Sequence, residues 1–541
     1  MLATSRGTAT HFLFSRPRRA VVLLLLAALV GWWASAEAAD RAACYTTLLF
    51  AGLVAILTSA VSILMLPLHL WAHRPARNAA WLVWFLLLFV PVYVQAAAWQ
   101  AGAAWWGWQA LGVASSHDPW LWRWGAALWI HVMAAMPWAM WILRCGINQI
   151  DRTVLESAVL EASRGRVFRH VISVELLPWV ALATSWAAIV AATELFVVDL
   201  YLIPAVARQL YTGFAIGTDA LSAVKMAAGT VLAGGLLVSL IWQPERWRSA
   251  RWDAVFAEPI ITGQPALWWA SALLVLIVIG VLLVPVGSLW IEAGTLYDAS
   301  GARHWSWQRF LEKWSSGWSD FRQEIYGTLV VSAAAAVLGV SSSFALLAVV
   351  FGKRPEACGW CWAVVLALLP GPLVGIGLTA ALRLPGWHAL VWLFDQTLFA
   401  PIVAAALRGW PLCWIVLVLA WRNVPRSYWE TAFLEAVPRR RFIGKVVWPM
   451  TRAPAAVALV LALAHASGEL AATLIVIPPG AETVAVRIAN LMHTGVRDKE
   501  AVLCLYHLLG CCGIVLVTWV GLIHTGWHGK DRAGHPEHPT G

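Results

Sequence analysis

Long apolar stretches separated by short polar segments dominate this chain of 541 residues. Twelve of the stretches approach or exceed the length of about 20 residues that an α-helix needs to cross a bilayer. They cover approximately residues 20–37, 46–70, 79–99, 124–143, 179–203, 222–242, 267–290, 326–351, 362–382, 399–420, 453–475 and 501–524. The pattern predicts an all-α integral membrane protein with about 12 transmembrane helices.

The composition agrees with this prediction. Hydrophobic residues make up 61% of the chain and charged residues 12%, whereas a soluble domain carries about 25% charged residues. Many of the 38 tryptophans stand near the ends of apolar stretches, where the amphipathic indole suits the headgroup region. In this context the net charge of +10 indicates basic cytoplasmic loops rather than a nucleic-acid partner.

The basic residues also predict the orientation of the chain. With the N-terminus in the cytoplasm, 25 of the 38 Lys and Arg residues fall in cytoplasmic segments, as the positive-inside rule requires. The clearest examples are Arg246, Arg248 and Arg251, and the triplet Arg439–Arg441. We therefore expect a multi-pass protein of the cell (inner) membrane with both termini cytoplasmic.

The first apolar stretch has a second interpretation. Basic residues in Arg16–Arg19, the apolar run Val21–Val30 and the small residues Ala34–Ala36 follow one another in the order of a cleaved signal peptide. Cleavage would leave the rest of the predicted topology unchanged, because the next span would still begin outside.

Residues that recur 274 positions apart indicate an internal repeat. The pairs at this offset are Pro137 and Pro411, Arg152 and Arg426, Glu156 and Glu430, Glu161 and Glu435, and Pro204 and Pro478. Upstream the offset drifts, as changes in loop length would produce: Thr47 resembles Thr328, and Pro91 resembles Pro370. We expect two halves, 1–255 with spans 1–6 and 256–541 with spans 7–12. Because six is even, the two six-helix repeats would be oriented in parallel, about an axis along the membrane normal.

A cytoplasmic loop lies between the fourth and fifth spans of each half, at 144–178 and 421–452. Read as helices, both loops carry a narrow apolar stripe, formed by Leu155, Ala158, Val159 and Ala162 in the first and by Trp429, Ala432, Phe433 and Ala436 in the second. Arg152 with Glu156, and Arg426 with Glu430, can form ion pairs at i, i+4. One such helix could be an ordinary connector on the membrane surface, but two in one register favour helices that dock in grooves of a partner.

These loops carry a resemblance to a known family. Glu156-Ser-Ala and Glu430-Thr-Ala resemble the "EAA" loop of binding-protein-dependent ABC importer permeases. The family has a Gly six residues after the Glu and a Pro nineteen after it. Here both glycines are alanines, Ala162 and Ala436, and this puts the backbone after the coupling helix in question because Ala lacks the conformational freedom of Gly. Pro449 stands at the expected place in the second loop, and Pro178 stands twenty-two residues after the Glu in the first.

Two fused halves of this length look most like the iron(III) and thiamine importer permeases. The resemblance implies two copies of an ABC ATPase subunit as partners, together with a periplasmic or extracellular substrate-binding protein and membrane lipid, but no nucleic acid. It implies that ATPase coupling falls to Arg152, Glu156, Ala158, Glu161, Arg426, Glu430, Ala432 and Glu435. The chain itself has no phosphate-binding loop of the Gly-x-x-x-x-Gly-Lys-Ser/Thr type. We therefore expect a transporter subunit without cofactor or enzymatic activity, with ATP hydrolysis on a separate chain.

Ionisable residues inside the predicted spans are candidates for the substrate pathway or its gate, because charges are costly at membrane depth. They are Glu194, Asp199, Arg408 and Glu469. The carboxylates would suit a cationic substrate, or Arg408 could pair with Glu469 or Asp199 as a structural ion pair or outer gate. His131 and His465 are interpreted as packing or hydrogen-bonding residues, and no cluster has the spacing of a metal site.

The substrate remains open among iron(III) or another small cation, thiamine and oxyanions. A secondary transporter driven by an ion gradient would also explain twelve spans and a repeat, but it would not explain two EAA-like loops. A membrane-embedded enzyme acting on lipid is disfavoured because no nucleophile motif such as Gly-x-Ser-x-Gly occurs.

Overall fold

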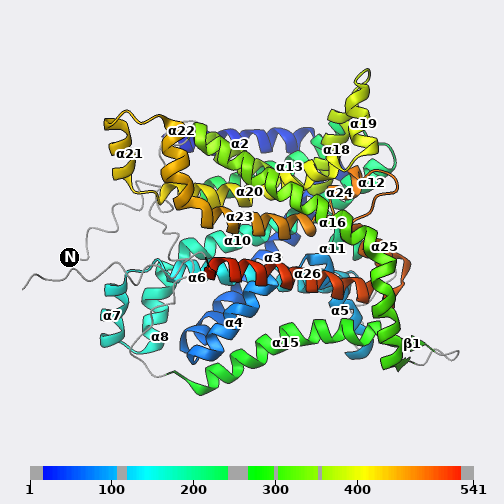
Figure 1. The fold of residues 1–541 in the computed structure, drawn as a ribbon, viewed down its shortest axis with the longest axis horizontal. Coiled ribbons are helices and arrows are strands. Elements are labelled where there is room, and N and C mark those ends of the chain that lie inside the picture. The colour runs from blue at the N-terminus through cyan, green and yellow to red at the C-terminus, as the bar shows by residue number, and fades with distance from the viewer. Residues whose placement is uncertain (1–15, 107–118, 242–265, 298–302, 351–355, 525–541) are drawn as a thin grey trace, which may run out of the picture.

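The computed structural model describes residues 16–106, 119–241, 266–297, 303–350 and 356–524. Arg246, Arg248 and Arg251, on which the predicted orientation partly rests, lie outside the described residues. Figure 1 shows an assembly of helices with one short β-hairpin. The hairpin pairs β1 (Thr295–Tyr297) with β2 (Arg303–Trp305) in antiparallel register.

The helices follow one another along the chain with short connections. Up to residue 241 they are α2 (Arg16–Ser35), α3 (Ala38–Trp71), α4 (Arg74–Leu87), α5 (Val92–Trp106), α6 (Trp120–Ile147), α7 (Arg152–Glu161), α8 (Arg164–Val167), the π-helical turn η2 (Phe168–Ile172), α9 (Ser173–Glu175), α10 (Leu177–Thr193), α11 (Phe196–Leu200), α12 (Val206–Ala215) and α13 (Ala220–Ile241). From residue 268 they are α15 (Trp268–Ala293), α16 (Trp307–Val350), α17 (Glu356–Leu368), α18 (Gly371–Leu382), α19 (His388–Gln396), α20 (Phe399–Arg422), α21 (Arg426–Leu434), α22 (Arg439–Phe442), the π-helical turn η4 (Ile443–Val447), α23 (Trp448–Ser467), α24 (Thr473–Val476), α25 (Val484–Thr494) and α26 (Arg497–His524).

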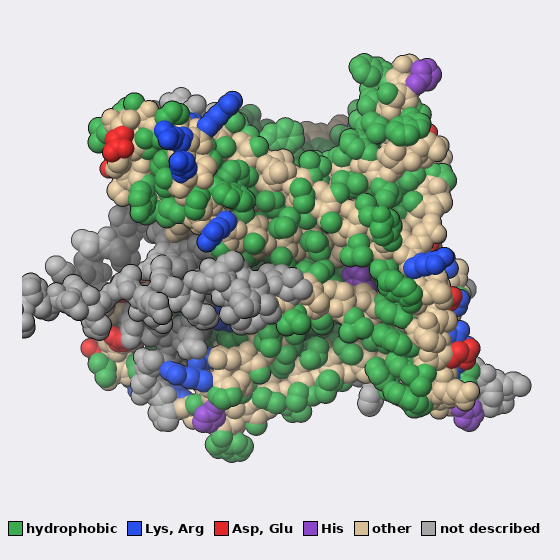
Figure 2. Space-filling model, viewed as in Figure 1, with side chains coloured by type: hydrophobic (Ala, Val, Ile, Leu, Met, Phe, Trp, Pro, Cys, Tyr) green, Lys and Arg blue, Asp and Glu red, His purple; other side chains and the backbone are tan. Residues whose placement is uncertain are grey.

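Eight helices in the described part of the chain are long and apolar enough to cross a membrane, and three strongly bent helix pairs raise the number to eleven if each pair is one span. The eight are α3, α6, α13, α15, α16, α20, the continuous stretch Arg439–Ser467 and the first twenty residues of α26. The structure is therefore that of an all-α, multi-pass membrane protein. Figure 2 shows hydrophobic side chains over most of one long face, with charged side chains mainly toward the two ends.

Four stretches expected as continuous spans are interrupted, and this corrects the sequence prediction. The stretch 79–99 is bent by 108° between α4 and α5, and 362–382 is bent by 107° between α17 and α18. Pro91 and Pro370 stand at these two bends. Proline removes a backbone donor and disfavours helical geometry at the residue before it, so it interrupts a helix at these points.

The other two interruptions fall at the predicted pathway carboxylates. The stretch 179–203 breaks after α10, and 453–475 breaks after α23. Glu194 is the first residue past α10, and its backbone is extended, with φ −80° and ψ 138°. Gly468 is the first residue past α23, and Glu469 follows it. Each break leaves backbone N–H groups that need a hydrogen-bond acceptor.

Two groups of three helices form the centre of the molecule. Helices α3, α6 and α10 pack against one another, and so do α16, α20 and α23. Small residues allow the close approach in the second group. They are Ala335, Ala336 and Gly339 on α16, and Ala404, Ala405 and Ala406 on α20, and all six are buried. Without a hydrophobic driving force inside lipid, such small-residue contacts are what lets helices associate by van der Waals packing.

The outer helices cross over between these two groups. Helix α15 follows the 242–265 segment in the chain, yet it packs on α3, α4 and α5. Helix α13 packs on α17 and α18 as well as on α2 and α3. The early and late parts of the chain are therefore interlocked rather than separate bodies.

The two ends of the molecule differ in what they carry. Helices α7 and α21 project at one end, whereas α19, α25 and the β-hairpin lie at the other (Figure 1). At this second end, two threonines make the same contact. The hydroxyl of Thr47 on α3 accepts from the N–H of Val206 at 2.8 Å, and the hydroxyl of Thr328 on α16 accepts from the N–H of Val484 at 2.8 Å. Each contact anchors the first residue of a short helix, α12 or α25.

Candidate functional site

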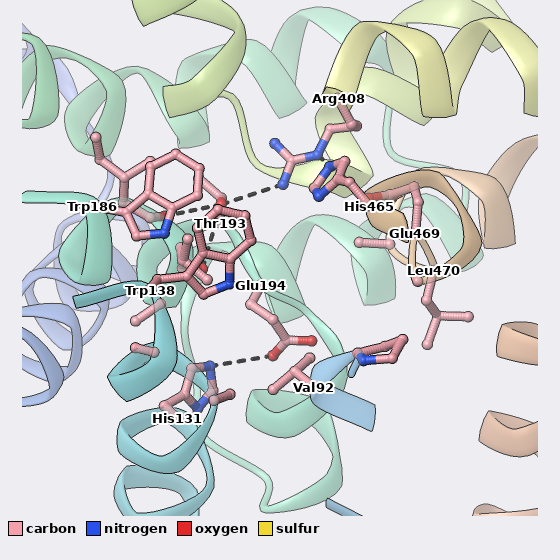
Figure 3. A pocket seen from close by; sticks show the side chains of 18 of the residues that line it. Val92, His131, Trp138, Trp186, Thr193, Glu194, Arg408, His465, Glu469 and Leu470 are labelled. Carbon is pink, nitrogen blue, oxygen red and sulfur yellow. Dashed lines mark hydrogen bonds and ion pairs between the residues drawn. The ribbon is translucent and has the colours of Figure 1, made fainter. Parts of the chain in front are cut away.

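A cavity of about 200 Å³ lies between the two central groups of helices. Its walls come from α3, α6 and α10 on one side and from α17, α20 and α23 on the other, together with the bend before α5. Most of its lining is apolar, and Trp138 and Trp186 lie side by side in it, with ring centroids 5.3 Å apart. Figure 3 shows that polar groups from both sides meet in it.

Glu194 brings a carboxylate into the cavity from the end of α10. Its two oxygens accept hydrogen bonds from the backbone N–H groups of Phe196 at 2.6 Å and Val197 at 2.9 Å. Nε2 of the buried His131 on α6 lies 3.5 Å from the same carboxylate. The backbone donors at the start of α11 therefore hold the side chain in place, and His131 adds a partner whose charge depends on protonation.

Glu469 supplies the corresponding carboxylate from the other side. Its Oε1 accepts from the N–H of Ala472 at 2.7 Å, and its Oε2 lies 3.6 Å from Nε of Arg408 on α20. The two side chains are only 5% and 11% exposed, so each neutralises a charge that would be costly alone.

Arg408 links three separate parts of the chain. Besides Glu469, its guanidinium donates to the carbonyl of Leu369 at 2.6 Å, at the bend between α17 and α18, and to the hydroxyl of Thr193 at 3.4 Å. Thr193 is the last residue of α10 (Figure 3). One cation thus connects the two groups of central helices across the cavity.

The predicted pathway residues are therefore only partly brought together. Glu194, Arg408 and Glu469 line the cavity, but Asp199 does not. Asp199 lies on α11, where its carboxylate is 3.0 Å from Nε of Arg208 and 3.7 Å from Nε2 of His493. The sequence alternatives paired Arg408 with Glu469 or with Asp199, and the structure has the first pair.

Several lining residues were not predicted from the sequence. His131 and His465 were interpreted as packing residues, yet both line the cavity, and His131 faces Glu194. Thr193 was not singled out because a threonine at a helix end carries no distinctive pattern. Its position immediately before Glu194 is the only signal that could have marked it. Among the described residues, no group of three or more His, Cys, Asp or Glu side chains is placed to hold a metal ion.

The two predicted cytoplasmic helices are present as α7 and α21, at the same end of the molecule (Figure 1). In α7 the predicted stripe is confirmed: Leu155 is buried, and Ala158, Val159 and Ala162 pack beside it. The Asp151 side chain caps this helix by accepting from the N–H and the hydroxyl of Thr153, both at 2.8 Å. These hydrogen bonds, the one from the hydroxyl first, lower the pKa of Asp151.

In α21 half of the predicted stripe is wrong. Trp429 and Ala432 pack against the protein, but Phe433 is 85% exposed and Ala436 is exposed as well. The helix ends at Leu434, and Ala436 adopts a left-handed backbone with φ 51°. The chain therefore leaves the helical path before it completes the turn that would have brought these two residues inward.

Ala436 occupies one of the two places where the EAA-like pattern has Gly. The left-handed conformation is one that Gly adopts freely and Ala does not. Ala162, at the other place, has φ −139° and is extended. The two loops thus end their helices differently, although their sequences align.

The remaining coupling candidates are open to solvent. Glu156, Glu161, Glu430 and Glu435 are exposed, as are Leu160 at 88% and Leu434 at 82%. The predicted ion pair between Arg426 and Glu430 is confirmed at 2.9 Å, but such an exposed pair contributes little stability. The side chain of Arg152 lies outside the described part of the structure.

A comparison with models of protein families finds no match for this chain, and a comparison with curated proteins finds none either.

Proposed function

We propose that this chain is the membrane-spanning permease subunit of an ABC importer, with two homologous halves that enclose the substrate pathway and dock on two separate ATPase subunits. The observation that carries the proposal is the pair α7 and α21. Both are short helices at one end of the molecule, and Leu160 and Leu434 occupy the same register in them, each more than 80% exposed. An exposed leucine at the tip of each helix is suited to a groove in a partner.

Equivalent features support two repeats, 1–255 and 256–541. The bends at Pro91 and Pro370 differ by only one degree. The contact of Thr47 with Val206 matches that of Thr328 with Val484. The central groups α3, α6, α10 and α16, α20, α23 also follow the same order in the chain. In this proposal the repeats contribute six spans each, with α2 as the first.

The cavity is then the closed part of a pathway between the repeats. Glu194 and Glu469 occupy corresponding breaks, at α10–α11 and α23–α24, and Arg408 holds the two sides together. Opening the pathway would require the contact between Arg408 and Thr193 to separate. The end with α7 and α21 would face the cytoplasm, because it also carries the basic α22. The opposite end would receive substrate from a binding protein.

The first experiment is affinity purification of the tagged full chain from its own membranes in mild detergent. The test variant combines Leu160→Asp with Leu434→Asp. Ile216→Asp is the matched control, because Ile216 is 85% exposed beyond the end of α12, at the opposite end of the molecule. We expect an ATPase subunit to co-purify with the wild type and the control and to be lost from the test variant. Glu156→Arg combined with Glu430→Arg should have the same effect through charge.

Each variant must elute from gel filtration as the wild type does. If a well-folded wild type yields no ATPase, and if it transports alone in liposomes under an ion gradient, then a secondary transporter is the correct class and the coupling assignment is wrong.

A further inference from the structure

Helix α16 is far longer than a membrane span. Its 44 residues extend over about 66 Å at 1.5 Å per residue, whereas the hydrocarbon core is about 30 Å thick. Six charged residues lie in 307–324, namely Arg309, Glu312, Lys313, Asp320, Arg322 and Glu324, and 325–350 holds none. The second part of the helix therefore suffices for the span, and 307–324 lies outside the hydrocarbon core. This first part begins beside β1, at the end opposite α7 and α21 (Figure 1).

One side of segment 307–324 is tightly bound to the protein. The buried residues Phe310, Gly317, Phe321 and Glu324 recur at helical spacing. Phe310 stacks on Trp290 of α15 with centroids 4.2 Å apart, and Trp314 stacks on Tyr506 of α26 at 4.6 Å. Lys313 pairs with Asp498 at 2.8 Å. These contacts fix the rotation of the helix about its axis.

The solvent-exposed part of the segment divides into two neighbouring stripes. The apolar stripe consists of Trp307, Leu311, the half-buried Trp314 and Trp318, at i, i+4, i+7 and i+11. The polar stripe consists of Gln308, Glu312, Ser315, Ser319 and Gln323, one position further round the helix at i, i+4, i+7, i+11 and i+15. The segment thus presents three sides, toward protein, toward an apolar phase and toward water.

We propose that segment 307–324 lies in the membrane–water interface and binds phospholipid at the headgroup level through Trp307, Leu311 and Trp318. The apolar stripe continues into the membrane-spanning part of the same helix, because exposed Leu329 stands eleven residues, or three turns, after Trp318. Exposed Trp305 and Trp290 extend the stripe sideways, with Trp305 5.9 Å from Trp307 and Trp290 5.9 Å from Trp307 between ring centroids. Tryptophans of this kind favour the headgroup region.

A lipid surface fits this segment better than a protein partner. A protein docked from the aqueous side would cover the exposed polar stripe as well, where Gln308, Glu312 and Ser319 offer little apolar area. A membrane surface instead divides an amphipathic helix along a plane, with aromatic and leucine side chains below it and polar ones above it. The one-residue displacement between the two stripes is what such a plane requires.

Photo-cross-linking of the full chain in phospholipid nanodiscs tests the proposal. A photoreactive phenylalanine analogue replaces one residue at a time: Leu311 or Trp318 in the apolar stripe, and the adjacent Glu312 or Ser319 as matched controls. The probe is a bilayer of phosphatidylethanolamine and phosphatidylglycerol, and mass spectrometry identifies the adducts. We expect lipid adducts at 311 and 318 and their loss at 312 and 319.

Equal lipid adducts at all four positions would overturn the proposed rotation of the segment. Absence of lipid adducts at 311 and 318 would overturn the proposal itself. Cross-links from these two positions to another protein, when the chain is irradiated in its own membranes, would assign the stripe to a protein partner instead. Because the readout is lipid contact, it is independent of whether an ATPase binds at α7 and α21.

Discussion

Single side chains decide where the helices of this protein stop and how the chain continues past each helix end. Glu194 ends α10 and immediately offers its carboxylate to the N–H groups of Phe196 and Val197. At the start of α7, Asp151 does the same for the N–H of Thr153. Ala436 instead comes after α21 with a left-handed backbone and without a glycine. Local substitutions can test the roles of Asp151 and Ala436.

Ala436→Gly should stabilise the connection from α21 to α22. An L-residue in the left-handed region costs about 1–2 kcal/mol, and Gly removes this cost while adding some entropy to the unfolded chain. We expect a net gain of about 1 kcal/mol, which would slow amide exchange across 433–442 by about fivefold. Ala162→Gly is the matched control. Because Ala162 is extended, that change should leave exchange unchanged or make it faster, and slower exchange in both variants would contradict the explanation.

Asp151→Ala should loosen α7, because the cap on its first turn is lost. The wild type should show the same effect at low pH. Folding lowers the pKa of Asp151, so the stabilisation is present above the usual carboxyl pKa of about 4 and is lost as the pH falls through the lower pKa of the folded state. Amide exchange of 152–161, corrected for the intrinsic pH dependence, measures both effects. Helix α21 begins after Pro425, which has no side-chain cap, and should serve as an insensitive internal reference.

Among the helices and their connections, the interruptions matter more than the spans. The bends at Pro91 and Pro370 and the breaks after α10 and α23 bring backbone and carboxylates to the centre, where a continuous helix would present only side chains. Toward the opposite end, α12 and α25 are fixed to α3 and α16 by one threonine hydroxyl each. These two hydrogen bonds join elements that are more than 150 residues apart in the chain.

Thr47→Val and Thr328→Val should each destabilise the protein. Valine keeps the shape but leaves the buried N–H of Val206 or Val484 without its acceptor, at a cost of about 1–3 kcal/mol. Thr451→Val is the control, since the buried hydroxyl of Thr451 bonds the carbonyl of Val447 in the turn before it. The midpoint of thermal unfolding in one detergent should fall clearly for the first two variants and little for the control. Equal shifts in all three would show that the hydroxyl contacts do not tie the short helices down.

For the molecule as a whole, two features join the early and late parts of the chain. The outer helices α13 and α15 pack across on the other group, and Arg408 reaches Thr193 over the cavity. The large apolar surfaces under α15 belong to α3, α4 and α5, so neither part can bury its own faces alone.

Expression of 1–255 and 256–541 as separate chains should test this interlocking. We expect each alone to aggregate or to be degraded, because α3, α5 and α15 would lose their partners. Co-expressed, the two should assemble and co-purify in a complex with the gel-filtration volume of the intact chain. A stable, monodisperse 1–255 would contradict the interlocked packing.

Arg408→Gln should destabilise the protein by about 3–5 kcal/mol, because it leaves the Glu469 charge buried without its partner. Adding Glu469→Gln should recover part of the loss, since the double variant holds no unpaired charge at that place. Thermal unfolding of the wild type, both single variants and the double variant gives the interaction between the two residues. Additive losses would mean that Arg408 and Glu469 do not act as a pair.

The sequence by itself determined that the chain is helical and membrane-spanning, where most spans lie, and where the two short helices at one end begin. Hydrophobicity and periodicity suffice for this, because lipid selects each span by the local composition of about 20 residues. The sequence also singled out Glu194, Arg408 and Glu469 as costly charges, and all three line the cavity.

Only the tertiary structure decided which partner each charge has, that Asp199 pairs with Arg208 away from the cavity, and that Phe433 faces outward. The contact between Arg408 and Thr193 joins residues 215 positions apart, and no local pattern encodes such a pairing. The orientation of Phe433 depends on a single backbone conformation at Ala436. Composition acts locally and is legible along the chain, whereas ion pairs, helix breaks and facing surfaces depend on which distant segments pack together.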